Sequence, residues 1–139
     1  MGRVIQMGRM GLVAIAVVTA ACGSGSSSPG SPTGGGGSTA QTCGTDGKTI
    51  VIANNAVCPS TLTVSLGSQV TFVNNDAQSH NMVSDPHPEH TDCPPINDVG
   101  FLTSGQSRQT GNLVVARTCG FHDHDNFSVK SLQGSITIK

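Results

Sequence analysis

Short runs rich in Val, Ile and Thr alternate with turn residues along the last two thirds of the chain. The runs TIVIAN, TLTVSLG and SQVTFVNND lie between residues 49 and 76, and SHNMVS, QSRQT, LVVARTC and GSITIK follow between residues 79 and 139. Runs of this length, bounded by Gly, Pro, Asn or Asp, are typical of β-strands, and no apolar run has a helical period over a helical length. The pattern predicts an all-β domain, a two-sheet sandwich of about seven or eight strands.

The expected core is aliphatic, because the sequence has no Trp or Tyr and only four Phe. Most of the burial is expected from Ile50, Ile52, Leu62, Val64, Val70, Leu113, Val115, Ile136 and Ile138. A core built from small side chains is marginal for a domain of about 100 residues, so disulfides would help. Cys43 and Cys58 are placed to link the first strand to the second, a bond typically worth about 2–4 kcal/mol.

The first 22 residues have the composition of an export signal. Arg3 and Arg9 precede an apolar run at residues 11–18, which is too short to span a bilayer and is followed by small residues up to Cys22. The ending TAAC resembles the lipobox of bacterial lipoproteins, although the usual Leu is missing. Cys22 is therefore expected to carry lipid and to tether the protein to the periplasmic or extracellular face of a membrane at the cell envelope. Ordinary cleavage near Cys22 is the alternative.

Residues 23–41 are almost entirely Gly, Ser, Pro and Thr, and they are expected to form a flexible linker with a reach of about 25 Å. The functional domain is then residues 42–139. Without Arg3 and Arg9 the chain keeps five basic and eight acidic residues, a formal charge of −3. No basic patch suggests a nucleic-acid partner. No nucleophile lies beside a base and an orienting acid, so we do not expect an enzyme. We also expect the protein to be a monomer.

Two segments carry a resemblance to a known family. CPSTLTVSLGSQVTFVNNDAQSHNM, at residues 58–82, resembles the first half of a cupredoxin, the family of plastocyanin and azurin. CGFH, at residues 119–122, and LQGSITIK, at residues 132–139, resemble the C-terminal loop and last strand of that family. The resemblance implies a Greek-key β-sandwich that binds copper and exchanges single electrons with redox partner proteins. By position, it assigns His80, Cys119 and His122 as the copper ligands, a set that suits both oxidation states of copper.

The resemblance also implies roles around the metal. Asn81 would tie the loop of His80 to the backbone near Thr118, as residues behind metal ligands commonly do. The position of the family's axial Met holds Leu132, which would leave copper three-coordinate, and the loop before it is longer than usual. His124 could then become a fourth ligand. Met82 is another possible axial ligand, although a Met in a strand usually belongs to the core.

The number of cysteines favours a different arrangement. If Cys43 pairs with Cys58, a copper-bound Cys119 would leave Cys93 as a free thiol in an oxidising compartment, which is unfavourable. A disulfide between Cys93 and Cys119 would remove the thiolate. The protein would then be a copper-binding or copper-handling module with a histidine-only site. A metal-free structural or adhesive sandwich is the third possibility.

The remaining histidines could supply such a site. His87 and His90 lie in the proline-rich segment SDPHPEHTDCPP, and together with His122 and His124 they could form a cluster. Imidazole suits copper and zinc equally, so histidines alone do not select the metal. GFHDH also resembles a local motif of copper/zinc superoxide dismutases, in which two histidines flanking one residue bind copper. A dismutase would need its ligands in reverse order, because no His follows His124.

Overall fold

The computed structural model of the protein describes residues 41–139. The predicted export signal, the predicted lipid attachment at Cys22 and nearly all of the predicted linker lie outside the described residues. The described strands are β1 (Thr49–Ala53), β2 (Ala56–Cys58), β3 (Thr61–Val64), β4 (Thr71–Asn74), β5 (His80–Ser84), β6 (Gly100–Leu102), β7 (Ser107–Gln109), β8 (Arg117–Asp123) and β9 (Gln133–Ile138). Two short 3-10 helices, η1 (Pro94–Asp98) and η2 (Lys130–Leu132), complete the described elements.

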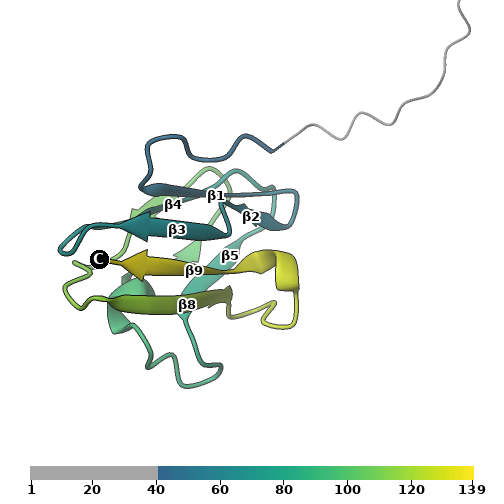
Figure 1. Cartoon of the computed structure of the whole chain (residues 1–139). Helices are drawn as coiled ribbons and strands as arrows, with labels where there is room; N and C mark the ends of the chain where they lie inside the picture. Colours follow the sequence, from purple (N-terminus) through teal and green to yellow (C-terminus); the bar gives the residue numbers. More distant parts are fainter. Residues whose placement is uncertain (1–40) are drawn as a thin grey trace, which may run out of the picture. The chain divides into compact units, whose positions relative to one another are not determined.

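The strands form two sheets packed as a sandwich (Figure 1). One sheet has the order β2-β1-β4-β7 and the other has the order β3-β9-β8-β5-β6. Strand β1 runs parallel to β4, and β3 runs parallel to β9, while the remaining pairs are antiparallel. The predicted all-β, two-sheet architecture is confirmed. The three-residue strands β2 and β6 were not predicted.

The turn between β1 and β2 shows how local sequence fixes the edge of the first sheet. Asn54 and Asn55 both have positive φ, 52° and 57°. Asn accepts this conformation better than most residues, and a two-residue hairpin turn requires it. The backbone N–H groups of both residues donate to the carboxylate of Asp76, at 3.1 and 2.7 Å. This contact joins the turn to the loop that leads into β5.

The core between the sheets is aliphatic, as predicted, with two aromatic rings in it. Phe72 and Phe121 meet edge to face, with ring centroids 5.2 Å apart. Seven of the predicted core positions are buried: Ile50, Ile52, Val64, Val70, Leu113, Ile136 and Ile138. Leu62 packs against the core while partly exposed.

The prediction for Val115 is wrong, because its side chain is 59% exposed. The run LVVARTC was expected to be a strand from residue 113, but β8 begins at Arg117. Before that point only Leu113 makes a sheet contact, an isolated bridge to Ser68. The residues after Leu113 therefore lack a neighbouring strand, and β8 instead continues four residues beyond Cys119, to Asp123.

Two disulfides link the described part of the chain. Cys43 is bonded to Cys58, which confirms the predicted pair and joins the segment before β1 to the end of β2, and Cys93 is bonded to Cys119. Disulfides persist in oxidising compartments, so both bonds indicate that the domain is exported from the cytoplasm. None of the helices found in residues 41–139 has the length and apolar character needed to cross a membrane.

Candidate metal centre

Strand β8 divides its side chains between two faces, and this division determines the site. Successive side chains of a strand point to opposite faces. Cys119 and Phe121 belong to the hydrophobic core. His122 lies directly across from Val83 of β5 on the outer face of the sheet. Because Cys119 and His122 are three residues apart on one strand, they point to opposite faces and cannot bind the same ion.

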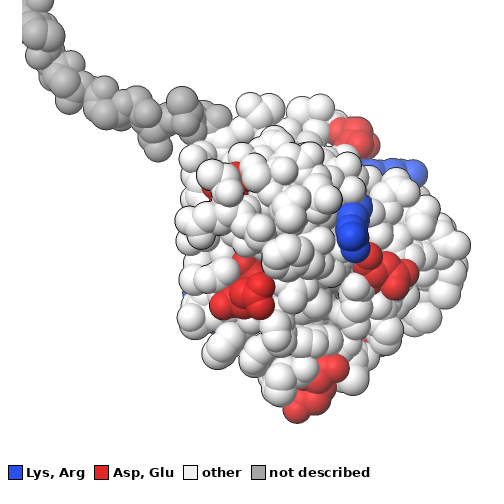
Figure 2. Space-filling view, turned by 180° about the vertical axis from the view of Figure 1, so that it is seen from behind, with Lys and Arg blue, Asp and Glu red and all other residues white. Residues whose placement is uncertain are grey.

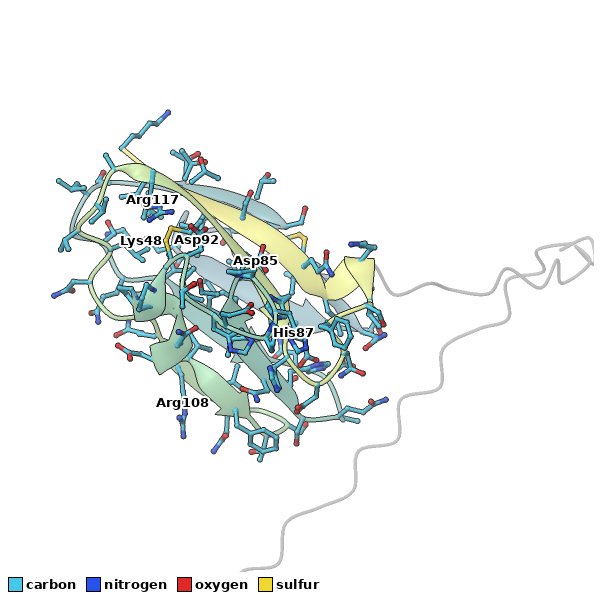
Figure 3. The ribbon with its side chains drawn as sticks, turned by 90° about the horizontal axis from the view of Figure 1, so that it is seen from below. Lys48, Asp85, His87, Asp92, Arg108 and Arg117 are labelled. Carbon is cyan, nitrogen blue, oxygen red and sulfur yellow. A yellow bond between two sulfur atoms is a disulfide. The ribbon has the colours of Figure 1, made fainter. Side chains whose placement is uncertain are left out.

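The segment between β5 and η1 brings two more histidines to the outer face. Its ends are joined by a hydrogen bond from the N–H of Asp92 to the carbonyl oxygen of Asp85, at 2.8 Å. Within it, the N–H of His90 donates to the carbonyl oxygen of Pro86 at 2.7 Å. The side chain of Asn97 donates to the carbonyl oxygen of His90 at 2.9 Å, which holds this residue at a φ of 53°. These contacts shape a closed loop over the end of β8, labelled at Asp85 and His87 in Figure 3.

Four imidazoles meet under this loop: His87, His90, His122 and His124. One ligand atom from each lies within 4.8 Å of all the others. The closest pair is Nδ1 of His124 and Nε2 of His90, 3.1 Å apart. Two nitrogens bound tetrahedrally to one ion at about 2.0–2.1 Å are roughly 3.3 Å apart, so this pair already has the spacing of two ligands. The structure thus brings together the four histidines that the sequence offered as a possible cluster.

His122 is held in the orientation that a ligand requires. Its Nδ1 lies 2.6 Å from Oδ1 of Asp85. If Nδ1 carries the proton and donates it, the lone pair is on Nε2. That Nε2 is buried and has no hydrogen-bond partner, which is unfavourable for a polar atom. A metal ion would bind this lone pair, and a carboxylate on the other ring nitrogen is the usual support of a metal-binding His.

The absence of a side chain at Gly120 makes room for this carboxylate. Gly120 lies on the same face of β8 as His122, and a Cβ atom built at Gly120 would overlap the carboxylate of Asp85. The backbone N–H of Asp85 also donates to the carbonyl oxygen of Gly120 at 3.1 Å. The sequence CGFH therefore supplies both an imidazole and the space for the residue that orients it.

The surroundings of His90 favour its neutral imidazole. The pKa of His90 lies below its usual value, first because burial disfavours the charged ring and then because His124, His122 and His87 are close enough to repel a proton. Metal ions bind the neutral ring, so the lowered pKa of His90 keeps it ready to bind. A donor set of four imidazoles fits copper, zinc, nickel or iron and does not fit calcium or magnesium, which prefer oxygen.

The predicted role of Cys119 as a thiolate ligand is wrong in this structure. Its sulfur is bonded to that of Cys93, as the cysteine count had suggested. The side chain is fully buried in the core, on the opposite face of β8 from His122. The site is therefore built from histidines alone, the arrangement that the sequence had offered as the alternative.

His80 lies outside the cluster, contrary to its assignment as the first ligand. It points inward from β5, and its two ring nitrogens contact carboxylates: Nδ1 lies 2.8 Å from Asp123 and Nε2 lies 3.3 Å from Asp76. Burial raises the pKa of Asp123, but hydrogen bonds from His80, Asn126 and the backbone N–H groups of Asn81 and Asp125 outweigh it and leave this pKa below its usual value. His80 thus joins Asp123 and Asp76 in a hydrogen-bonded network instead of contributing to the cluster.

The remaining predicted residues lie in structural positions. Met82 and Leu132 are fully buried in the core, so neither is available to the cluster. Asn81 contacts the end of β8, where its carbonyl oxygen accepts from the N–H of His124 at 2.7 Å. Thr118 lies at the start of β8 and pairs with Thr137. The predicted link between Asn81 and Thr118 is therefore wrong, because β5 and β8 are antiparallel. Asn81 lies beside the last residues of β8, whereas Thr118 lies near its first.

Two residues that matter to the site were not found from the sequence. Asp85 is one of eight acidic residues. Only its position in SDPHPEH, close to His87 and His90, could have indicated that it belongs to the metal centre. Phe127 stacks on His87, with ring centroids 4.1 Å apart and an interplanar angle of 6°. Its position in the longer loop after β8 gave no sign of this contact.

Comparisons with known proteins identify the fold. No protein-family model matches the sequence, and no curated protein matches it. Among solved structures, the oxidized form of plastocyanin from Dryopteris crassirhizoma is 20% identical, with 66% of this chain and 99% of that chain covered at a TM-score of 0.53. Amicyanin from Paracoccus versutus is 15% identical, with 69% and 84% covered and a TM-score of 0.53.

A reduced Cu(I) form of an amicyanin mutant is 18% identical, with 66% of this chain and 80% of that chain covered at a TM-score of 0.50. At these identities the likeness concerns the fold, and it confirms the predicted cupredoxin-like β-sandwich.

Proposed function

We propose that this domain of cupredoxin fold is a copper-binding and copper-handling module that holds one copper ion through His87, His90, His122 and His124. The observation that supports this most directly is the convergence of four imidazoles around a buried nitrogen of His122 that has no partner. The protein would bind copper and release it to another molecule without acting as an enzyme.

Copper is preferred to other ions for two reasons. Nitrogen donors bind Cu(II) more tightly than the other divalent ions of the first transition series, zinc included. The fold is also shared with an amicyanin structure described as a Cu(I) form. When bound, copper would keep its imidazole ligands in both of its oxidation states.

The residues of the chain would keep the site ready for the ion. Asp85 orients His122 through the hydrogen bond to Nδ1, and the closed loop presents His87 and His90. The Cys93–Cys119 bond fixes that loop to β8, because Cys93 follows His90 by three residues and Cys119 precedes His122 by three. The ligands would therefore lose little conformational freedom when copper binds.

One-electron transfer to redox partner proteins is the second candidate function. It is favoured by the exposed position of His87, which would bring the metal close to the surface. Without a thiolate, the two oxidation states prefer different geometries, and electron exchange would be slower than at a site with Cys119 as ligand. Voltammetry of the copper-loaded protein distinguishes the two functions, because reversible one-electron waves at fast scan rates would favour electron transfer.

The proposed location is the cell envelope. A lipid on Cys22 would tether a monomeric domain to a membrane surface through residues 23–41, and the ion could then pass to a partner near that surface. Mass spectrometry of the mature protein would detect the lipid on Cys22.

The ligand set can be tested by competition. Purified protein is titrated with Cu(II) against a chromophoric chelator, and we expect one copper per chain. His122→Gln should lower the affinity at least about 100-fold, because it removes the oriented and buried donor. Glu89→Gln is the matched control, because Glu89 is exposed between His87 and His90 and is not a proposed ligand, so this change should lower the affinity far less than His122→Gln does. Equal copper binding by wild type and His122→Gln would refute the proposed site.

A further inference from the structure

The four imidazoles of the cluster are held to different degrees. His122 is only 2% exposed and has its ring fixed by Asp85. His124 is fixed through its backbone by Asn81, and its ring contacts that of His90. His90 is fixed through its backbone by Pro86 and Asn97. His87 is exposed, and no hydrogen bond within residues 41–139 involves either its ring or its backbone.

The ring of His87 is instead held by stacking. Its face lies parallel to that of Phe127, at a centroid distance of 4.1 Å. Its ring centroid is also 5.0 Å from that of His124 and 5.6 Å from that of His122, so the stacked position directs it toward the cluster. Stacking is weaker and less directional than the contact of Asp85 with the His122 ring and the hydrogen bonds that hold the backbone of His90 and His124.

Phe127 is itself well anchored, although half of its surface is exposed. Its carbonyl oxygen accepts from the side chain of Gln133 at 2.6 Å. The preceding residue, Asn126, donates from its side chain to the buried Asp123 at 2.9 Å. The longer loop after β8 therefore presents an anchored aromatic face to the exposed imidazole of His87. Another phenylalanine, Phe101 on β6, has nearly the same exposure, 51% against 50%, and stacks on no histidine among the described residues.

We propose that His87 is the exchange ligand through which copper enters and leaves the cluster, and that Phe127 is the positioning residue that sets the rate of this exchange. The inference rests on the proposed function. During release, the bond from copper to His87 breaks and a bond to the incoming ligand forms at the same position, with no change of oxidation state. His90, His122 and His124 keep hold of the ion until the incoming ligand replaces them.

The test measures the rate at which the Cu(II)-loaded protein gives up copper to excess EDTA. Phe127→Leu keeps an apolar side chain but removes the flat face, so copper release should be about two- to ten-fold faster, the range expected for one lost aromatic contact. Phe127→Tyr keeps the stacked ring, so copper release from this variant should occur at the wild-type rate. Phe101→Leu is the exposure-matched control and should release copper at the wild-type rate.

A second variant tests His87 directly. His87→Ala should still bind one copper, with faster release and an altered Cu(II) spectrum, whereas His122→Gln should show the much larger loss of affinity expected for the oriented, buried donor. Wild-type release rates in Phe127→Leu would overturn the role of Phe127, and loss of copper from His87→Ala as complete as from His122→Gln would overturn the role of His87. Failure of the wild-type protein to bind copper would instead refute the proposed function itself, so the two failures are distinguishable.

Discussion

The smallest unit of the site is a pair of residues, Asp85 and His122. One oxygen of Asp85 contacts Nδ1 of His122, and the other lies where a side chain at Gly120 would project. The pair fixes the ring and determines which nitrogen faces the cluster. A change at any of these three positions should therefore alter metal binding through the orientation of one imidazole.

Asp85→Asn should lower the affinity for Cu(II) by about 10- to 100-fold, the range found when residues that support a metal ligand are replaced. The amide keeps the shape of the side chain but no longer provides a charged acceptor for Nδ1. Competition titration against a chromophoric chelator measures the change. Glu89→Gln is the control, because it removes the same charge as Asp85→Asn from a nearby residue. An affinity equal to that of wild type would show that His122 needs no support from Asp85.

Gly120→Ala should weaken copper binding through the same contact, because the new methyl group displaces the carboxylate of Asp85. The effects of Gly120→Ala and Asp85→Asn should then not add, since each removes the same hydrogen bond. Affinities of the two single variants and the double variant measure the coupling. Strictly additive losses would mean that Gly120 acts through some other contact.

At the scale of elements, strand β8 and the loop between β5 and η1 cooperate through the Cys93–Cys119 disulfide. The bond fixes the loop that carries His87 and His90 to the strand that carries the other two ligands. The second disulfide, Cys43–Cys58, lies at the first sheet. Cys93–Cys119 closes a loop of 26 residues and Cys43–Cys58 closes one of 15. By restricting the unfolded chain, the two bonds should stabilise the fold by similar amounts, about 3.5 and about 3 kcal/mol.

Removal of each disulfide should therefore have similar effects on stability and different effects on copper. The double variant Cys93→Ser, Cys119→Ser should lower both the free energy of unfolding and the copper affinity, because the loop loses its covalent attachment to β8. The double variant Cys43→Ser, Cys58→Ser should lower the free energy of unfolding alone. Denaturant unfolding and copper titration measure the two quantities. Equal losses of affinity in both variants would contradict a specific role for the Cys93–Cys119 bond.

The whole molecule joins two sheets into a sandwich whose outer face carries the metal centre. Charged side chains are sparse on the face shown in Figure 2, and in places acidic and basic groups lie next to each other. The core and the disulfides hold the sheets together whether or not copper is bound. Copper should therefore add to the stability of a domain that is already folded.

Copper binding should raise the melting temperature measurably. A ligand at 100 times its dissociation constant stabilises the folded state by about 2.7 kcal/mol, and each kcal/mol shifts the midpoint of a domain of this size by about 4–8 °C. The melting temperature should thus rise by roughly 10–20 °C in calorimetry and return to the apo value after EDTA treatment. His122→Gln should show no such shift. A wild-type midpoint unaffected by copper would contradict binding to the folded state.

The sequence was sufficient to predict the fold, because alternating Val, Ile and Thr runs and the family resemblance indicate the same sandwich. It also contained the cluster, since four of the five histidines lie in two short segments. The sequence was not sufficient to predict whether the Cys119 side chain faces the core or the metal centre, because its direction depends on how far β8 extends. Pairing with β5 and β9 carries the strand through CGFHD, and these contacts come from residues distant in sequence. The contacts of Asp85 and Phe127 likewise depend on how two loops meet.

The most direct test of a histidine-only copper site is the optical and electron paramagnetic resonance spectrum of the Cu(II)-loaded protein. We predict one Cu(II) per chain, hyperfine splitting from several imidazole nitrogens and only weak visible absorption. An intense thiolate-to-copper charge-transfer band, lost in Cys119→Ser, would contradict this prediction and restore Cys119 as a ligand.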